Sequence, residues 1–126
     1  MAYRLEKEKT TSTPYMLIDE EKSYMRFEGR SFHENVVEFF TDVNDWLDTY
    51  LETDFGCFTF DFEMNYFNSS TSKLLHNMLT KMDNCVSDKK KVIVNWITTE
   101  DNDIIIECGE DFQEDFDNLE FNMIIR

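Results

Sequence analysis

The sequence predicts a single small α/β domain, with a mixed sheet of four to five strands and about three helices. Strict alternation of apolar and polar residues marks one long strand, and apolar residues at three- and four-residue spacing mark three helices. The predicted strands and helices follow one another in the order ββαβαβαβ. Strands that alternate with helices favour parallel neighbours joined by right-handed crossovers. The length of 126 residues fits one domain.

The N-terminal part of the chain predicts a flexible segment and then a β-hairpin. Residues 1–13 are polar and charged, so we expect a flexible lead-in before a single domain over residues 14–126. Short aromatic and aliphatic runs at 15–18 and 24–27 flank a polar stretch, which is typical of a hairpin. Residues 36–50 then place apolar side chains at helical spacing between acidic ones, which predicts an amphipathic helix.

The same two periodicities predict the remaining elements. Residues 58–66 alternate between apolar and polar side chains and predict a strand. Helical spacing returns over 75–86, a β-branched strand follows at 92–97, and a last strand is expected at 119–125. Residues 101–116 predict a helix, although Gly109 lowers the helix propensity at its centre.

Charge and composition exclude several classes of partner. The chain has 27 acidic and 12 basic residues, a net charge of −15, and one short basic run, KKK at 89–91. We therefore expect neither nucleic acid nor an anionic membrane as a partner. The N-terminus lacks the apolar region of a signal peptide, and the three cysteines form no Cys-x-x-Cys pair. These features predict a cytoplasmic protein with reduced thiols.

Signals for catalysis, metal binding and cofactor binding are weak. The two histidines lack zinc-site spacing, and the three glycines form no phosphate-binding loop, so we expect no enzyme, metal or cofactor. Adjacent carboxylates are numerous, but in so acidic a chain they are expected to be solvated surface. A small hydrolase that uses Asp61, Glu63 or Glu110 as acid and base is the least favoured alternative.

One segment, residues 66–73, has more hydroxyls than its structure requires. Ser69, Ser70, Thr71 and Ser72 follow one another where a strand gives way to a helix, and one side chain, from Asn68 or Ser69, suffices to cap that helix. A phosphate on Ser69 or Ser70 would suit the helix N-terminus, with Lys73 one turn away. The segment also begins the only basic part of the chain, since residues 67–98 carry five basic and two acidic residues. Capping and regulatory phosphorylation are both open at this point.

Five separated blocks of the sequence resemble the SiaC family of bacterial regulatory phosphoproteins, over residues 12–125. The blocks are STPY (12–15), SFHEN (31–35) with EFF (38–40) and DWL (45–47), YFNSS (66–70), GEDF (109–112) and FN (121–122). The resemblance implies a STAS-like fold, similar to anti-sigma-factor antagonists. It also implies a non-enzymatic adaptor that a serine/threonine kinase phosphorylates and a PP2C-type phosphatase dephosphorylates. The unphosphorylated form would bind and activate a diguanylate cyclase, which raises cyclic di-GMP and promotes biofilm or aggregation.

The family pattern also implies a specific modified residue. Its hydroxyl directly follows Tyr-aromatic-Asn, which corresponds to Ser69 here, with Ser70 and Thr71 as neighbouring candidates. The family usually has Thr at this position, and it often has Pro where this chain has His33. The alternative is a constitutive interaction module of the anti-sigma-factor-antagonist type, in which Ser69 only caps the helix. We expect the partner-binding surface to comprise Tyr66, Phe67, Asn68, Ser69, Ser70 and Lys73.

Overall fold

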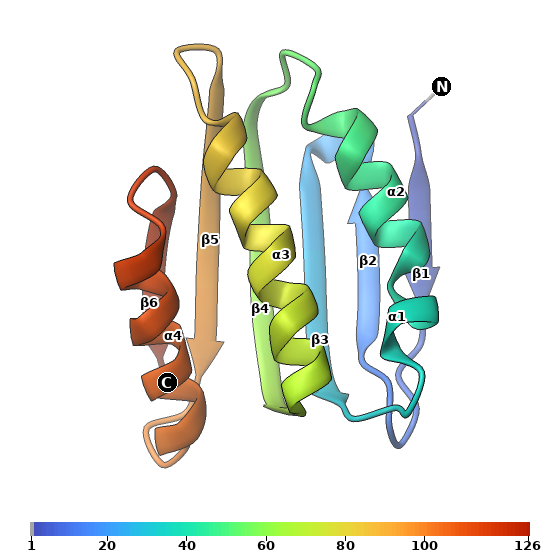
Figure 1. Cartoon of the computed structure of the whole chain (residues 1–126), viewed down its shortest axis with the longest axis vertical. Helices are drawn as coiled ribbons and strands as arrows, with labels where there is room; N and C mark the ends of the chain where they lie inside the picture. Colours follow the sequence, from blue (N-terminus) through green and yellow to red (C-terminus); the bar gives the residue numbers. More distant parts are fainter. Residues whose placement is uncertain (1) are drawn as a thin grey trace.

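Residues 2–126, which the computed structural model describes, form one mixed six-stranded sheet with helices packed on a single face (Figure 1). The predicted α/β class is confirmed, with one strand more than the highest expected number. The strands are β1 (Arg4–Lys7), β2 (Tyr15–Asp19), β3 (Tyr24–Ser31), β4 (Gly56–Phe67), β5 (Lys90–Thr98) and β6 (Glu120–Ile125). The helices are η1 (Glu20–Lys22, 3₁₀), α1 (Val36–Phe39), α2 (Thr41–Tyr50), α3 (Ser69–Cys85) and α4 (Asp103–Asp115).

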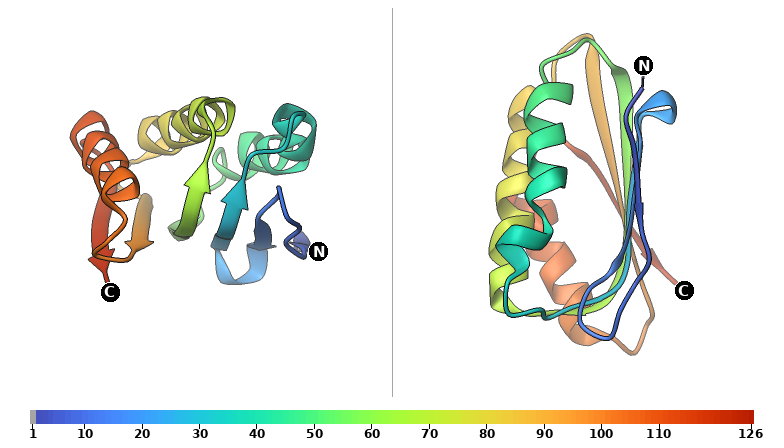
Figure 2. Two further views of the ribbon diagram at one scale, coloured as in Figure 1. Left: turned by 90° about the horizontal axis from the view of Figure 1, so that it is seen from below. Right: turned by 90° about the vertical axis from the view of Figure 1, so that its right-hand side faces the viewer.

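The strands lie in the sheet in the order in which they occur in the chain. β1, β2 and β3 pair antiparallel, whereas β3, β4, β5 and β6 pair parallel. Each parallel connection steps in the same direction and contains a helix, so right-handed crossovers place all the long helices on one face (Figure 2). The C-terminal ends of β3–β6 therefore meet at one side of the sheet. We call this side the carboxyl edge, and it consists of residues 31–37, 66–73, 98–104 and 124–126.

The core lies between the helices and the inward side chains of β4 and β5. The alternation predicted for β4 is confirmed, because every second residue from Phe58 to Met64 is buried on the helix side. The Trp96 ring of β5 stacks on the Phe62 ring at 4.1 Å between centroids. The Trp96 Nε1–H donates to the Ile105 carbonyl of α4 at 2.9 Å. The indole thus connects the sheet to α4 by both packing and a buried hydrogen bond.

Hydrogen bonds between polar side chains occupy the face of the sheet opposite the helices. Asp61 accepts hydrogen bonds from the Tyr24 hydroxyl at 2.6 Å and the Asn95 amide at 2.8 Å, and Asn122 donates to Asn95 at 3.1 Å. Burial and the Asp61 carboxylate raise the pKa of Tyr24 to about 12. Arg26 pairs with Glu28, Asp61 and Glu63. Because these groups satisfy one another, this face stays folded without a second layer of helices.

Two predicted elements differ from the structure. A flexible lead-in is expected over residues 1–13, but Arg4–Lys7 form β1, which pairs antiparallel with β2 and accounts for the sixth strand. Charged residues are well tolerated on a short edge strand, so the charged composition of residues 1–13 gives no sign of β1. The single helix expected over 36–50 is divided into α1 and α2 at Phe40. There the Thr41 hydroxyl donates to the Val37 carbonyl, a contact that bends helices.

Gly109 should be required for the close approach of α4 to the sheet, despite its low helix propensity. A Cβ at this position would lie 2.5 Å from Trp96 Cδ1 and 2.8 Å from Met123 Sδ. We expect Gly109→Ala to lower the free energy of unfolding by about 1–3 kcal/mol, because overpacking outweighs the gain in helix propensity. Urea unfolding followed by Trp fluorescence measures the change. Equal or greater stability of the variant would contradict this packing.

The Cys108 thiol should react slowly in the folded protein. Burial, with a smaller contribution from Asp111, raises its pKa to about 11, so little thiolate is present at pH 8. We expect iodoacetamide at pH 8 to modify the exposed Cys57 well before Cys108. In urea, Cys108 should become reactive. Peptide mass spectrometry of timed samples measures both rates, and equal rates in the folded protein would contradict the prediction.

Candidate functional site

The junction between β4 and α3 continues the pairing of β3 with β4 by one residue. The backbone N–H of Asn68 donates to the Ser31 carbonyl at 3.0 Å, directly after the last register pair, Ser31 and Phe67. The Asn68 side chain then accepts a hydrogen bond from the Thr71 N–H at 2.9 Å and caps α3. Asn68 is therefore the capping residue, and Ser69 is the first residue of the helix.

The hydroxyls of the junction differ in their exposure and bonding. Thr71 is buried, and its hydroxyl lies 2.8 Å from that of Ser31, where the two share a hydrogen bond. Ser69 and Ser70 are exposed, and within residues 2–126 their hydroxyls have no hydrogen-bond partner. Thr71 thus joins α3 to β3. Among the three candidate hydroxyls, those of Ser69 and Ser70 are the ones that an enzyme can reach.

An exposed aromatic pair with a cation on it lies beside this junction. The Tyr66 and Phe32 rings are 6.1 Å apart, edge to face, and their residues are 43% and 37% exposed. The Arg30 guanidinium lies 5.7 Å from the Tyr66 ring centre and 5.3 Å from that of Phe32. A β-bulge between Gly29 and Arg30 shifts the register, so that Arg30 lies opposite Tyr66. Gly29 permits the bulge because its φ of 110° is unfavourable for other residues.

The predicted partner-binding residues do not all reach the surface. Tyr66 and Lys73 are exposed like Ser69 and Ser70, whereas Asn68 is half-buried. Phe67 points into the core, where its ring packs edge to face on Phe62 and Trp96. Arg30 and Phe32 belong to the exposed surface but were not predicted, because only the pairing of β3 with β4 places them beside Tyr66. Within the described chain, neither Arg30 nor Lys73 forms an ion pair with a carboxylate.

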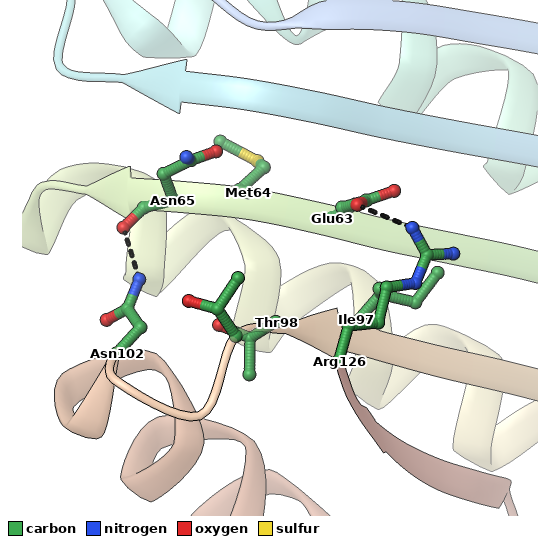
Figure 3. A pocket seen from close by; sticks show the side chains of 8 residues that line it. Glu63, Met64, Asn65, Ile97, Thr98, Asn102 and Arg126 are labelled. Atoms are coloured by element: carbon green, nitrogen blue, oxygen red, sulfur yellow. Dashed lines mark hydrogen bonds and ion pairs between the residues drawn. The ribbon is translucent and has the colours of Figure 1, made fainter.

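The carboxylates proposed for a hydrolase do not converge on one site. Asp61 and Glu63 belong to the polar network on the open face of the sheet, whereas Glu110 lies on α4, on the other face. Glu63 lines a small cavity of about 70 Å³ at the carboxyl edge, where Arg126 pairs with one of its oxygens (Figure 3). Arg26 pairs with the other oxygen. Asn102, on the same cavity, donates to the Asn65 carbonyl at 3.0 Å. Polar groups that line this cavity thus already have partners within the molecule.

Residues 2–126 contain neither a cluster suited to a metal ion nor a helix suited to a membrane. No cluster of three or more His, Cys, Asp or Glu side chains in this range has the geometry to hold a metal ion. No helix in the same range has the length and hydropathy needed to cross a bilayer.

Asn68 and Ser69 should contribute differently to stability. Asn68→Ala removes the cap of α3, so we expect the free energy of unfolding to fall by about 1 kcal/mol. Ser69→Ala removes a hydroxyl with no partner, and its effect should stay within about 0.5 kcal/mol. Urea unfolding of both variants and the wild type measures the difference. A larger loss for Ser69→Ala than for Asn68→Ala would mean that Ser69 has a structural role.

The chain is similar to known proteins over most of its length. The chain is 27% identical over 106 residues to an uncharacterized protein of Pseudomonas aeruginosa strain UCBPP-PA14, covering 84% of each chain. The fold of the present chain is similar to that of apo-SiaC from P. aeruginosa, with a TM-score of 0.81 and 25% identity over 98% of both chains.

A second solved structure shows a similar protein bound to a partner. It contains P. aeruginosa diguanylate cyclase SiaD in complex with its activator SiaC. The present chain matches it with a TM-score of 0.83 and 26% identity, over 96% of this chain and 97% of the other. The family model described as "SiaC family regulatory phosphoprotein" matches residues 7–126. The chain therefore belongs to the SiaC family of regulatory phosphoproteins.

Proposed function

We propose that this protein is a non-enzymatic adaptor whose binding to a partner is switched by phosphorylation of Ser69. The observation that carries the proposal is an exposed hydroxyl without a structural partner, at the first residue of α3. Asn68 already caps the helix and Thr71 already joins it to β3, so neither task requires Ser69. Ser70 is the neighbouring candidate, because it is equally exposed.

The start of α3 suits a phosphate group. A phosphoserine carries about −1.5 to −2 charges at neutral pH, and unpaired N–H groups in the first helical turn favour a negative charge. α3 has no acidic residue in its first turn to repel the phosphate, and Lys73 lies one turn further on. Phosphorylation would therefore leave the fold intact and change the charge of the surface beside Tyr66 and Phe32.

The proposed partners are a serine/threonine kinase, a PP2C-type phosphatase and a diguanylate cyclase. The cyclase is supported by the structural similarity to a SiaC that is described as the activator of diguanylate cyclase SiaD. We propose that the unphosphorylated form binds and activates the cyclase in the cytoplasm, which raises cyclic di-GMP and promotes biofilm or aggregation. The phosphate would then exclude the cyclase by desolvation cost and like-charge repulsion.

Substitutions at Ser69 should separate the two states of the switch. We expect Ser69→Ala to bind and activate the cyclase of the same organism like the wild type, and Ser69→Asp to lose at least about tenfold in affinity. Asn77→Glu is the matched control, because it adds one charge to an exposed position in the middle of α3. Its affinity should stay within about twofold of the wild type. Titration of the cyclase with each purified variant measures these affinities.

The modification itself is tested on protein isolated from its native cells. Intact-mass measurement followed by peptide fragmentation should locate one phosphate on Ser69. Protein that carries no phosphate on residues 69–72 under any growth condition would refute the switch. Equal binding by Ser69→Asp and Ser69→Ala would instead favour the constitutive interaction module.

A further inference from the structure

The exposed apolar side chains of the molecule are concentrated at the carboxyl edge. Seven large apolar side chains of residues 2–126 are exposed, and all but Tyr3 lie at this edge. Three of them are Phe32 and Tyr66, which lie beside the junction of β4 with α3, and Val37, which lies on α1. The other three are Ile104, at the start of α4, and Ile124 and Ile125, at the end of β6. We call these three residues the isoleucine flank.

Backbone and side-chain hydrogen bonds hold the isoleucine flank in line with Tyr66. The Asn102 amide donates to the Asn65 carbonyl at 3.0 Å, which joins the turn before α4 to the end of β4. The Arg126 N–H donates to the Thr98 carbonyl at 2.9 Å, which holds the last residues of β6 against the end of β5. Both groups of exposed apolar residues therefore belong to segments at the same end of the sheet.

Packing within the molecule does not explain the position of Ile104. Its neighbour Ile105 is 2% exposed and packs in the core, whereas Ile104 is 77% exposed. The buried stripe of α4 consists of Ile105, Gly109 and Phe112. Ile104 lies outside this stripe, at the same edge of the sheet as the exposed Ile124 and Ile125. Exposed apolar residues that gather on one part of a surface, unlike those scattered singly, mark interaction sites.

The charged residues around Ile104 indicate what kind of partner surface would bind there. Glu100, Asp101, Asp103 and Glu107 are all exposed, and within residues 2–126 none of them pairs with a basic side chain. An apolar side chain among four carboxylates is complementary to an apolar residue that has Lys or Arg on either side. A second copy of this chain, with its net charge of −15, is a poor match.

We infer that the isoleucine flank is the second half of the partner-docking surface, and that it receives a protein segment with apolar side chains flanked by Lys or Arg. The inference rests on the proposed adaptor function and extends its surface from α3 across β5 to β6. It also gives the two halves separate roles. Phosphorylation of Ser69 would weaken binding at the half of the surface beside Ser69. The isoleucine flank would supply binding energy at a place that the phosphate does not contact.

Site-specific photo-cross-linking in the native cells tests the inference, because it captures whichever protein lies against a chosen side chain. A benzophenone amino acid replaces Tyr66, Ile104 or Asn77 in the full chain, and mass spectrometry identifies each adduct. We expect the same partner protein at positions 66 and 104 and no adduct at the control position 77. The cross-linked segment of the partner should contain apolar residues flanked by Lys or Arg. Asp103→Asn with Glu107→Gln should reduce the yield at position 104 several-fold.

The outcomes separate the inference from the proposed function. An adduct at 66 with none at 104 would overturn the isoleucine flank and leave the adaptor function standing. An adduct at 104 that contains a second copy of the chain would also overturn it, in favour of self-association. Adducts at both positions that persist undiminished in Ser69→Asp would refute the switch but support the surface. No adduct at either position would refute both.

Discussion

The parallel pairing of β3 with β4, which extends beyond both strands to the hydrogen bond between Asn68 and Ser31, determines the geometry of the site. Because this bond fixes Asn68 at the end of β4, α3 begins at the next residue. Thr71 then points down onto Ser31, and the preceding serines point outward. The same pairing, with its bulge at Gly29, brings Arg30 onto the rings of Tyr66 and Phe32. One ladder thus positions both the hydroxyls and the surface beside them.

Stability and the proposed regulation involve different side chains of the same short segment. Asn68 and Thr71 satisfy backbone and buried polar groups, and a change at either of them affects the fold. Ser69 and Ser70 make no such bonds, so a modification there changes the surface without disturbing the core. Under the proposed switch, this division would let a phosphate be added and removed without unfolding the domain.

The acidic residues of the chain are distributed in two physically distinct ways. On the open face of the sheet, Asp61 and Glu63 are bound by Arg26, Tyr24 and Asn95, and these contacts are internal to the molecule. Around the start of α4, the carboxylates at positions 100–107 are exposed and have no basic partner in the described chain. The first group allows one face of the sheet to remain uncovered, and the second is available to another molecule.

The sequence by itself determined the α/β class, the strand 58–66, the order of the main elements and the family, because periodicity and short motifs are local properties. The sequence also indicated Ser69 as the expected site of phosphorylation. β1 was not predicted, because an edge strand depends on a partner strand elsewhere in the chain. The break at Phe40 was not predicted either, because the hydrogen bond from Thr41 to Val37 there does not alter the apolar spacing of residues 36–50. Only the tertiary structure decided that Asn68 is the cap and that Thr71 is buried. It also decided that Phe32 and Ile104 share the carboxyl edge and that Arg30 lies beside Tyr66. The reason is physical, since strand register and crossover direction decide which residues from separate segments meet.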